Sequence, residues 1–122
     1  MGVSERGCGR TRAFHGAVSI SGTAGFFGGK TLGIRAGDVI AIGRDRSACA
    51  LLYPPGSTEI SKVHCKLRLD AQNGCLSLTD SSKNGTYLRG GERLAPGREH
   101  VLADGEAFFL ATEDNGFVVS II

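Results

Sequence analysis

The sequence of 122 residues lacks any apolar run approaching the ~20 residues that a membrane-spanning helix needs. Its N-terminus has no apolar core of the kind that a secretory signal peptide requires. No window shows the apolar spacing of a long helix. These absences argue against a membrane protein, a secreted protein and a helical fold. We therefore expect a cytoplasmic protein without a membrane partner.

A strong charge of either sign is also missing. The chain has 14 lysines and arginines interspersed with 12 aspartates and glutamates, for a net charge of +2. Such a balance provides no general attraction to nucleic acid or to anionic lipid. We expect no nucleic-acid partner, and any recognition of an anion must come from a local group of residues.

The four cysteines, Cys8, Cys49, Cys65 and Cys75, include no C-x-x-C pair. An even number of cysteines indicates disulfides mainly in small secreted chains, and no signal peptide is evident here. The pattern therefore predicts reduced, mostly buried thiols.

Glycine, in contrast, is abundant, with 19 residues against three prolines. Short β-rich runs recur between turn signals, and one of them alternates strictly: Cys65, Leu67 and Leu69 share one face, and Lys66 and Arg68 the other. The runs are 17–22, 31–34, 38–43, 50–53, 64–69, 75–80, 86–88, 101–105, 106–111 and 117–122. The turn signals lie at 35–37, 72–74, 84–85, 104–105 and 115–116. Many short strands at this spacing predict an all-β sandwich.

The domain organisation follows from the same patterns. Residues 1–15 are polar, basic and irregular, which predicts a flexible extension or linker. Residues 16–122 have the size of one domain. The alternation leaves open whether Cys75 or Leu76 faces the core.

Residues 24–31, AGFFGGKT, match a loose nucleotide-binding P-loop pattern with alanine in the first glycine position. A P-loop needs a leading strand and a following helix, whose amides converge on phosphate. Gly33 and Gly37 follow here, and nothing downstream predicts a helix. A glycine-rich turn is the better interpretation, and we expect no ATP turnover.

Ser61 and His64, with Asp80 or Asp104, supply the residue types of a hydrolase triad. A serine and a histidine three apart on a turn that enters a strand are poorly placed for proton transfer. No nucleophile elbow of the G-x-S-x-G type surrounds Ser61. We therefore predict no catalytic residue and no enzyme activity.

Metal ligation could involve His64 and Cys65, with Cys75 or His100. Adjacent residues on a strand point to opposite faces and cannot share one ion without a bulge. We predict no metal site and no cofactor. For His64 we favour a structural role, in which its ring nitrogens bind the neighbouring loop by hydrogen bonds.

The stretch 59–86 contains the remaining motif residues. It follows a Gly43-Arg44 pair, opens with the S-x-x-H of Ser61 and His64, and ends with D-x-S-x-N-G-T at 80–86. In this order the motifs resemble those of the forkhead-associated (FHA) domain. The resemblance extends over about residues 16–122 and includes the late segment ADGEAFFLA.

The resemblance implies an FHA-like β-sandwich of two twisted, mostly antiparallel sheets, with about eleven strands and with the binding loops at one end. FHA domains bind phosphothreonine peptides. Carried over residue by residue, the phosphate-binding positions correspond to Arg44, Ser61, Lys62 and Lys83. Ser61 would use its hydroxyl and its amide. Asn84 corresponds to the residue that binds the peptide backbone beside the phosphothreonine.

Other positions in the resemblance shape these loops, and they correspond to Gly43, His64, Gly85 and Thr86. Lys62 departs from the family, which often has Arg or Asn there. In the family, residue preference after the phosphothreonine is usually set by the loop before the serine. Glu59 lies in that loop and would favour a basic or polar side chain in the partner.

The function implied is a non-enzymatic phosphopeptide-binding module that acts in Ser/Thr kinase-dependent signalling or assembly. Its partner would be a protein or peptide that contains phosphothreonine, such as a Ser/Thr kinase or its substrate, and the isolated domain would be a monomer. The alternative is a protein-protein scaffold that uses the same fold without reading phosphate, because some family members lose phosphate dependence. The nearly complete set of site residues favours the phosphate-dependent function.

Overall fold

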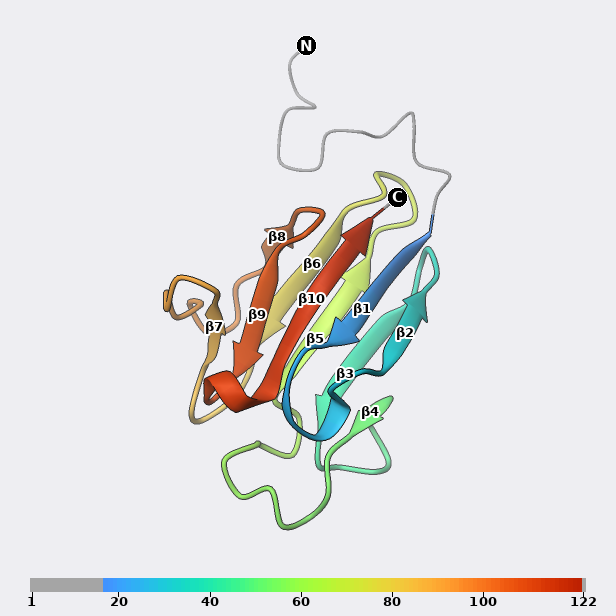
Figure 1. Cartoon of the computed structure of the whole chain (residues 1–122). Helices are drawn as coiled ribbons and strands as arrows, with labels where there is room; N and C mark the ends of the chain where they lie inside the picture. The colour runs from blue at the N-terminus through green and yellow to red at the C-terminus, as the bar shows by residue number, and fades with distance from the viewer. Residues whose placement is uncertain (1–16, 122) are drawn as a thin grey trace.

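The computed structural model describes residues 17–121, which form a sandwich of two five-stranded sheets (Figure 1). Strands lie at all ten predicted runs: β1 Val18–Gly22, β2 Thr31–Ile34, β3 Val39–Gly43, β4 Leu51–Leu52, β5 Cys65–Leu69, β6 Leu76–Asp80, β7 Thr86–Leu88, β8 His100–Leu102, β9 Ala107–Leu110 and β10 Gly116–Ile121. Two 3₁₀ turns, η2 Gly25–Phe27 and η3 Glu113–Asn115, accompany them. The predicted all-β sandwich is confirmed, with ten strands in the described part instead of about eleven. The predicted extension, residues 1–15, lies outside the described residues.

The strand order is β2-β1-β10-β9-β7 in one sheet and β4-β3-β5-β6-β8 in the other. The paired strands are antiparallel, except that β3 and β4 run parallel. The chain passes from one sheet to the other between β6 and β7. The Asn84-Gly85 turn therefore belongs to a crossover between the sheets and not to a hairpin.

The core lies between the two sheets and follows the predicted alternation. In β5, Cys65, Leu67 and Leu69 are buried while the residues between them are exposed. On β6 the inward face carries Leu76 and Leu78, so Leu76 is the residue that faces the core. Leu67 lies opposite Leu78 in the β5–β6 ladder, and both are fully buried. Each such leucine contributes about 1.5–3 kcal/mol of hydrophobic stabilisation.

One end of the sandwich gathers most of the irregular loops. The β3–β4, β4–β5 and β6–β7 connections lie there together with η2 and η3 (Figure 1). The turn predicted at 115–116 begins earlier than expected, because Ala111 has a φ of 64° and η3 follows it. Gly116 is already extended and begins β10.

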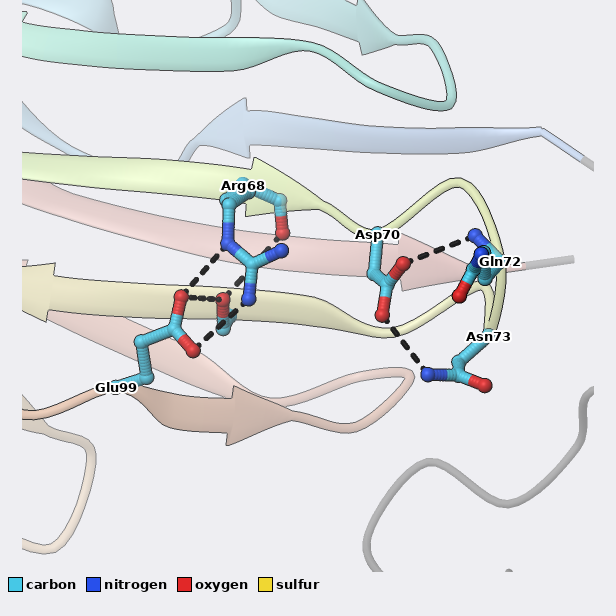
Figure 2. Close-up of polar contacts among 6 residues, drawn as sticks. Arg68, Asp70, Gln72, Asn73 and Glu99 are labelled. Carbon is cyan, nitrogen blue, oxygen red and sulfur yellow. Dashed lines mark hydrogen bonds and ion pairs between the residues drawn. The ribbon is translucent and has the colours of Figure 1, made fainter.

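The opposite end carries the β5–β6 hairpin, which polar contacts brace (Figure 2). Asp70 accepts hydrogen bonds from the Gln72 amide and from Asn73 Nδ2, each at 2.9 Å, and these bonds lower the pKa of its carboxyl. Arg68 forms a two-pronged ion pair with Glu99 at 2.7 and 2.9 Å. This pair is exposed, so it contributes little to stability.

The cysteines correct one prediction. Cys49 and Cys65 are free thiols, and burial raises the pKa of the Cys65 thiol so that it stays protonated. Cys75, however, is disulfide-bonded, so the expectation of reduced thiols is wrong at that position.

Among residues 17–121 there is no helix long and apolar enough to cross a membrane.

Candidate functional site

The site begins where β3 ends at Gly43, because two loops approach each other closely there. A side-chain carbon at Gly43 would lie 2.1 Å from the carbonyl oxygen of Lys62 and 2.8 Å from that of Ser61. Only a residue without a side chain allows this approach. Gly43 thus lets the β4–β5 loop close over the start of the β3–β4 connection.

Arg44 is held in place by hydrogen bonds to the β4–β5 loop. Its amide donates to the carbonyl oxygens of Ser61, at 3.3 Å, and Lys62, at 2.9 Å. Its side-chain Nε donates to the carbonyl oxygen of Ile60. The terminal guanidinium nitrogens have no hydrogen-bond partner within residues 17–121. Arg44 is therefore held in place while its two terminal nitrogens remain able to bind an anion.

Ser61 connects the β4–β5 loop to the β6–β7 loop. Its hydroxyl oxygen accepts a hydrogen bond from the Lys83 amide at 3.1 Å, and its own amide donates to His64 Nδ1 at 3.1 Å. The resemblance implied that the Ser61 amide contacts the phosphate, but that amide is already used by His64. The next amide, that of Lys62, has no partner in the described part of the chain and is a free donor of this turn.

His64 is fully buried beneath these loops. Because Nδ1 accepts from Ser61, Nε2 carries the hydrogen and donates to the carbonyl oxygen of Gly85 at 2.8 Å. Burial lowers the pKa of the imidazole, which keeps it neutral. His64 thereby joins the two loops that carry the predicted site residues.

We expect folding stability to fall as the pH drops below 6.5, the ordinary pKa of histidine. Because burial lowers the folded-state pKa of His64, the unfolded state binds more protons between that lowered value and 6.5. Stability is therefore greatest above pH 6.5 and is lost on acidification. Urea unfolding at pH 7.5 and pH 5 measures this loss. His64→Asn should reduce it, whereas His100→Asn should retain most of it; an equal loss in the wild type and His64→Asn would contradict the assignment.

The β6–β7 loop is shaped by the buried carboxylate of Asp80, the first residue of the D-x-S-x-N-G-T motif. Asp80 Oδ1 accepts from the Ser82 amide at 3.2 Å, the Ser82 hydroxyl at 2.6 Å and the Thr86 hydroxyl at 2.8 Å. Ser82 Oγ in turn accepts from the Gly85 amide at 2.7 Å. Asp80 and Ser82 are thus loop-forming residues, and the D-x-S-x-N-G-T spacing was the available signal for them.

This loop presents Lys83 and Asn84 at the surface. Asn84 Nδ2 donates to the carbonyl oxygen of Glu59 at 3.0 Å, and the Tyr87 hydroxyl donates to the Asn84 carbonyl oxygen at 3.3 Å. Gly85 has a φ of 96°, a conformation that favours glycine. The side chain of Lys83 and the Oδ1 atom of Asn84 have no hydrogen-bond partner in the described region.

Glu59 lies beside Asn84 and is half-buried. Its carboxylate accepts a hydrogen bond from Asn115 Nδ2 at 3.4 Å, and the same nitrogen donates to the Leu110 carbonyl oxygen at 3.0 Å. The β9–β10 connection therefore contributes to the site through Asn115. No sequence motif indicated this residue, because its contact with Glu59 joins distant parts of the chain.

Taken together, three loops bring the positive charges of Arg44, Lys62 and Lys83 to one end of the sandwich. No carboxylate in the described residues forms an ion pair with any of them. The nearby carboxylate of Asp45 accepts hydrogen bonds from its own turn, from the Ser47 amide at 2.9 Å and hydroxyl at 2.7 Å. This arrangement offers cationic groups and a free amide to an anion.

The structure also bears on the alternative chemistries. Ser61 contacts His64 through its amide and not through its hydroxyl, and the Asp80 carboxylate bonds to Ser82 and Thr86, so these residues do not form a triad. Residues 24–31 form the η2 turn and lead into strand β2, not into the helix that a P-loop requires. Within 17–121 there is no group of three or more His, Cys, Asp or Glu placed to hold a metal ion.

Comparisons with known proteins agree with this architecture. The chain shares 24% identity with the FHA domain of an Arabidopsis thaliana hypothetical protein, over 88% of this chain and 86% of that one, with a TM-score of 0.74. With the FHA domain of CT664 from Chlamydia trachomatis the chain shares 19% identity, over 87% of this chain and 98% of that one, with a TM-score of 0.72. The N-terminal FHA domain of S. cerevisiae Rad53p was solved with a phosphothreonine peptide. The chain shares 20% identity with it, over 87% of this chain and 94% of that one, with a TM-score of 0.69.

A search of curated proteins finds no match. The family model described as FHA domain matches residues 40–110, which include every predicted site residue from Gly43 to Thr86. This match covers more than half of the 122 residues. The chain belongs to the FHA domain family.

Proposed function

We propose that this FHA domain binds phosphothreonine in a partner protein and has no enzyme activity of its own. The observation that carries the proposal is the meeting of Arg44, Ser61 and Asn84 at one end of the sandwich, held there by contacts among their loops. The Rad53p domain, which has the same fold, was solved with a phosphothreonine peptide. That complex supports the same ligand class here.

The proposed roles follow from the free donors of the site. Phosphothreonine carries nearly two negative charges and three acceptor oxygens. Arg44 would bind these oxygens with its terminal nitrogens, and the Ser61 hydroxyl, the Lys62 amide and the Lys83 ammonium would add further donors. Hydrogen bonds to charged groups contribute about 1.5–3 kcal/mol each. A dianion among three cations explains how a nearly neutral protein recognises an acidic group.

Peptide orientation would come from Asn84 and Glu59. Asn84 Nδ2 bonds to the Glu59 carbonyl oxygen, which leaves Oδ1 for a peptide amide. The Glu59 carboxylate is held by Asn115 at the edge of the site, where it would favour a basic or polar side chain of the partner. We propose that the partner is a Ser/Thr kinase or a kinase substrate, bound by a monomeric domain during signalling or assembly.

A screen of an oriented phosphothreonine peptide library first selects a phosphothreonine peptide. The test then compares this peptide with its unphosphorylated twin. Calorimetry should detect binding of the phosphorylated peptide and not of its twin, because the unphosphorylated peptide lacks the dianion that the three cations would bind. Equal affinity for the two peptides would contradict the proposal. Partners captured from lysate that survive both phosphatase treatment and Ser61→Ala would indicate a phosphate-independent scaffold instead.

A further inference from the structure

An arginine outside every motif lies against the loop that carries Lys83 and Asn84. Arg93 belongs to the connection between β7 and β8 and forms an isolated antiparallel bridge with Tyr87. Its Nη2 donates to the Lys83 carbonyl oxygen at 3.3 Å. A side-chain carbon at Gly85 would come within 2.8 Å of Arg93 Nε, so the guanidinium packs directly on the loop.

The surroundings of Arg93 hold its backbone firmly. The next residue, Leu94, is buried, and its amide donates to the Thr86 carbonyl oxygen at 2.9 Å. Tyr87 stacks on Phe109 with ring centroids 5.1 Å apart and donates its hydroxyl to the Asn84 carbonyl oxygen. Arg93 therefore projects from a rigid support beside the proposed peptide-binding residue.

The charge of Arg93 is not neutralised within the molecule. The residue is exposed, and among residues 17–121 no carboxylate forms an ion pair with it. A guanidinium has five N–H donors, and the bond to Lys83 uses only one of them. A purely structural bond to one carbonyl oxygen would not need a charged fork, so the remaining donors are available to an acidic group.

The distance from the proposed phosphate position limits where that group can be. Arg93 is connected to Ser61 Oγ by two hydrogen bonds, one to the carbonyl and one from the amide of Lys83. The two side chains are therefore roughly 10 Å apart or less, given the length of one residue's backbone. An extended peptide advances about 3.3 Å per residue. An acidic side chain within about three residues of the phosphothreonine can reach Arg93.

We propose that Arg93 selects phosphothreonine peptides that carry an aspartate or glutamate within about three residues of the phosphothreonine. The inference rests on the proposed function, and it narrows the ligand class to acidic phosphopeptides. The phosphate would provide most of the affinity, and Arg93 would discriminate among phosphorylated partners. An exposed ion pair of this kind changes affinity by about fivefold at most.

The test is a charge exchange measured by fluorescence anisotropy. Phosphothreonine peptides with alanine at every flanking position are compared with peptides that carry one aspartate, or one lysine, at each of the three positions on either side. At one position or more, aspartate should tighten wild-type binding by up to about fivefold. Arg93→Gln should reduce that gain to less than about twofold, and Arg93→Glu should reverse it so that lysine is preferred.

Arg98→Gln provides the matched control, because Arg98 is an exposed arginine of the same connection whose side chain forms no hydrogen bond or ion pair with any other described residue. It should keep the wild-type preference. A loss of affinity for all peptides alike in Arg93→Gln, without a change in preference, would show that Arg93 only positions Lys83 and would overturn the inference. So would a wild-type protein that binds phosphothreonine without favouring aspartate. Failure of the wild type to bind any phosphothreonine peptide would instead contradict the proposed function itself.

Discussion

Arg44→Ala is expected to weaken binding of a phosphothreonine peptide by about 2–5 kcal/mol, which is at least about 30-fold in Kd. The reason is that Arg44 is the half-buried cation of the site, and its terminal nitrogens have no internal partner among the described residues. Its removal leaves the phosphate without its two-pronged donor. Calorimetry with the library-selected phosphopeptide measures the loss.

Two further variants separate recognition from folding. Arg44→Lys keeps the charge but loses the planar fork and the bond from Nε to Ile60, so an intermediate affinity is expected. Arg35→Ala removes an exposed arginine from the β2–β3 connection and should bind like the wild type. Thermal unfolding of each variant monitors the fold. Wild-type affinity in a folded Arg44→Ala protein would exclude Arg44 from the phosphate site.

The fold could be predicted because its strands are marked locally. Period-two alternation in 64–69 and glycine turns such as 104–105 identify strands without reference to any partner strand. The pairing could not be predicted in the same way. Nothing local shows that the chain changes sheets after Asp80, or that β4 runs parallel to β3, because those choices depend on contacts between distant segments.

The same distinction applies to the site, where local motifs identify some residues and not others. Motif spacing identified Gly43, Ser61 and His64, and the structure brings them together through short contacts. It did not identify Asn115 or Arg93, whose contacts come from connections that no motif covers.

The occupied amide of Ser61 was a different kind of omission. A residue's type and spacing indicate that it lies at a site, but they do not show which of its atoms a neighbour already uses. Here the neighbour is His64, whose Nδ1 accepts the hydrogen bond of the Ser61 amide. The next amide, that of Lys62, has no partner in the described part of the chain.

Gly43→Ala is expected to be the most destabilising single substitution at the site, at about 3 kcal/mol. The new methyl group would overlap the backbone carbonyl of Lys62, 2.1 Å away, and that of Ser61. Backbone atoms cannot move aside as a flexible side chain can, so the β4–β5 loop must shift as a unit. The same two carbonyls accept the Arg44 amide, so phosphopeptide affinity should fall together with stability. Urea unfolding and calorimetry measure the two losses.

Gly33→Ala is the matched control, because Gly33 also lies in a strand but has no atom within 4 Å of the position a methyl group would take. It should leave stability and binding close to wild type, as an alanine in a strand costs little where space is open. In Gly43→Ala the melting temperature should fall by on the order of 10 °C. Wild-type stability and affinity in Gly43→Ala would mean that the close approach of the two loops is not needed to form the site. A stability loss with unchanged affinity would mean that Arg44 reaches the phosphate without the carbonyls of Ser61 and Lys62 to anchor it.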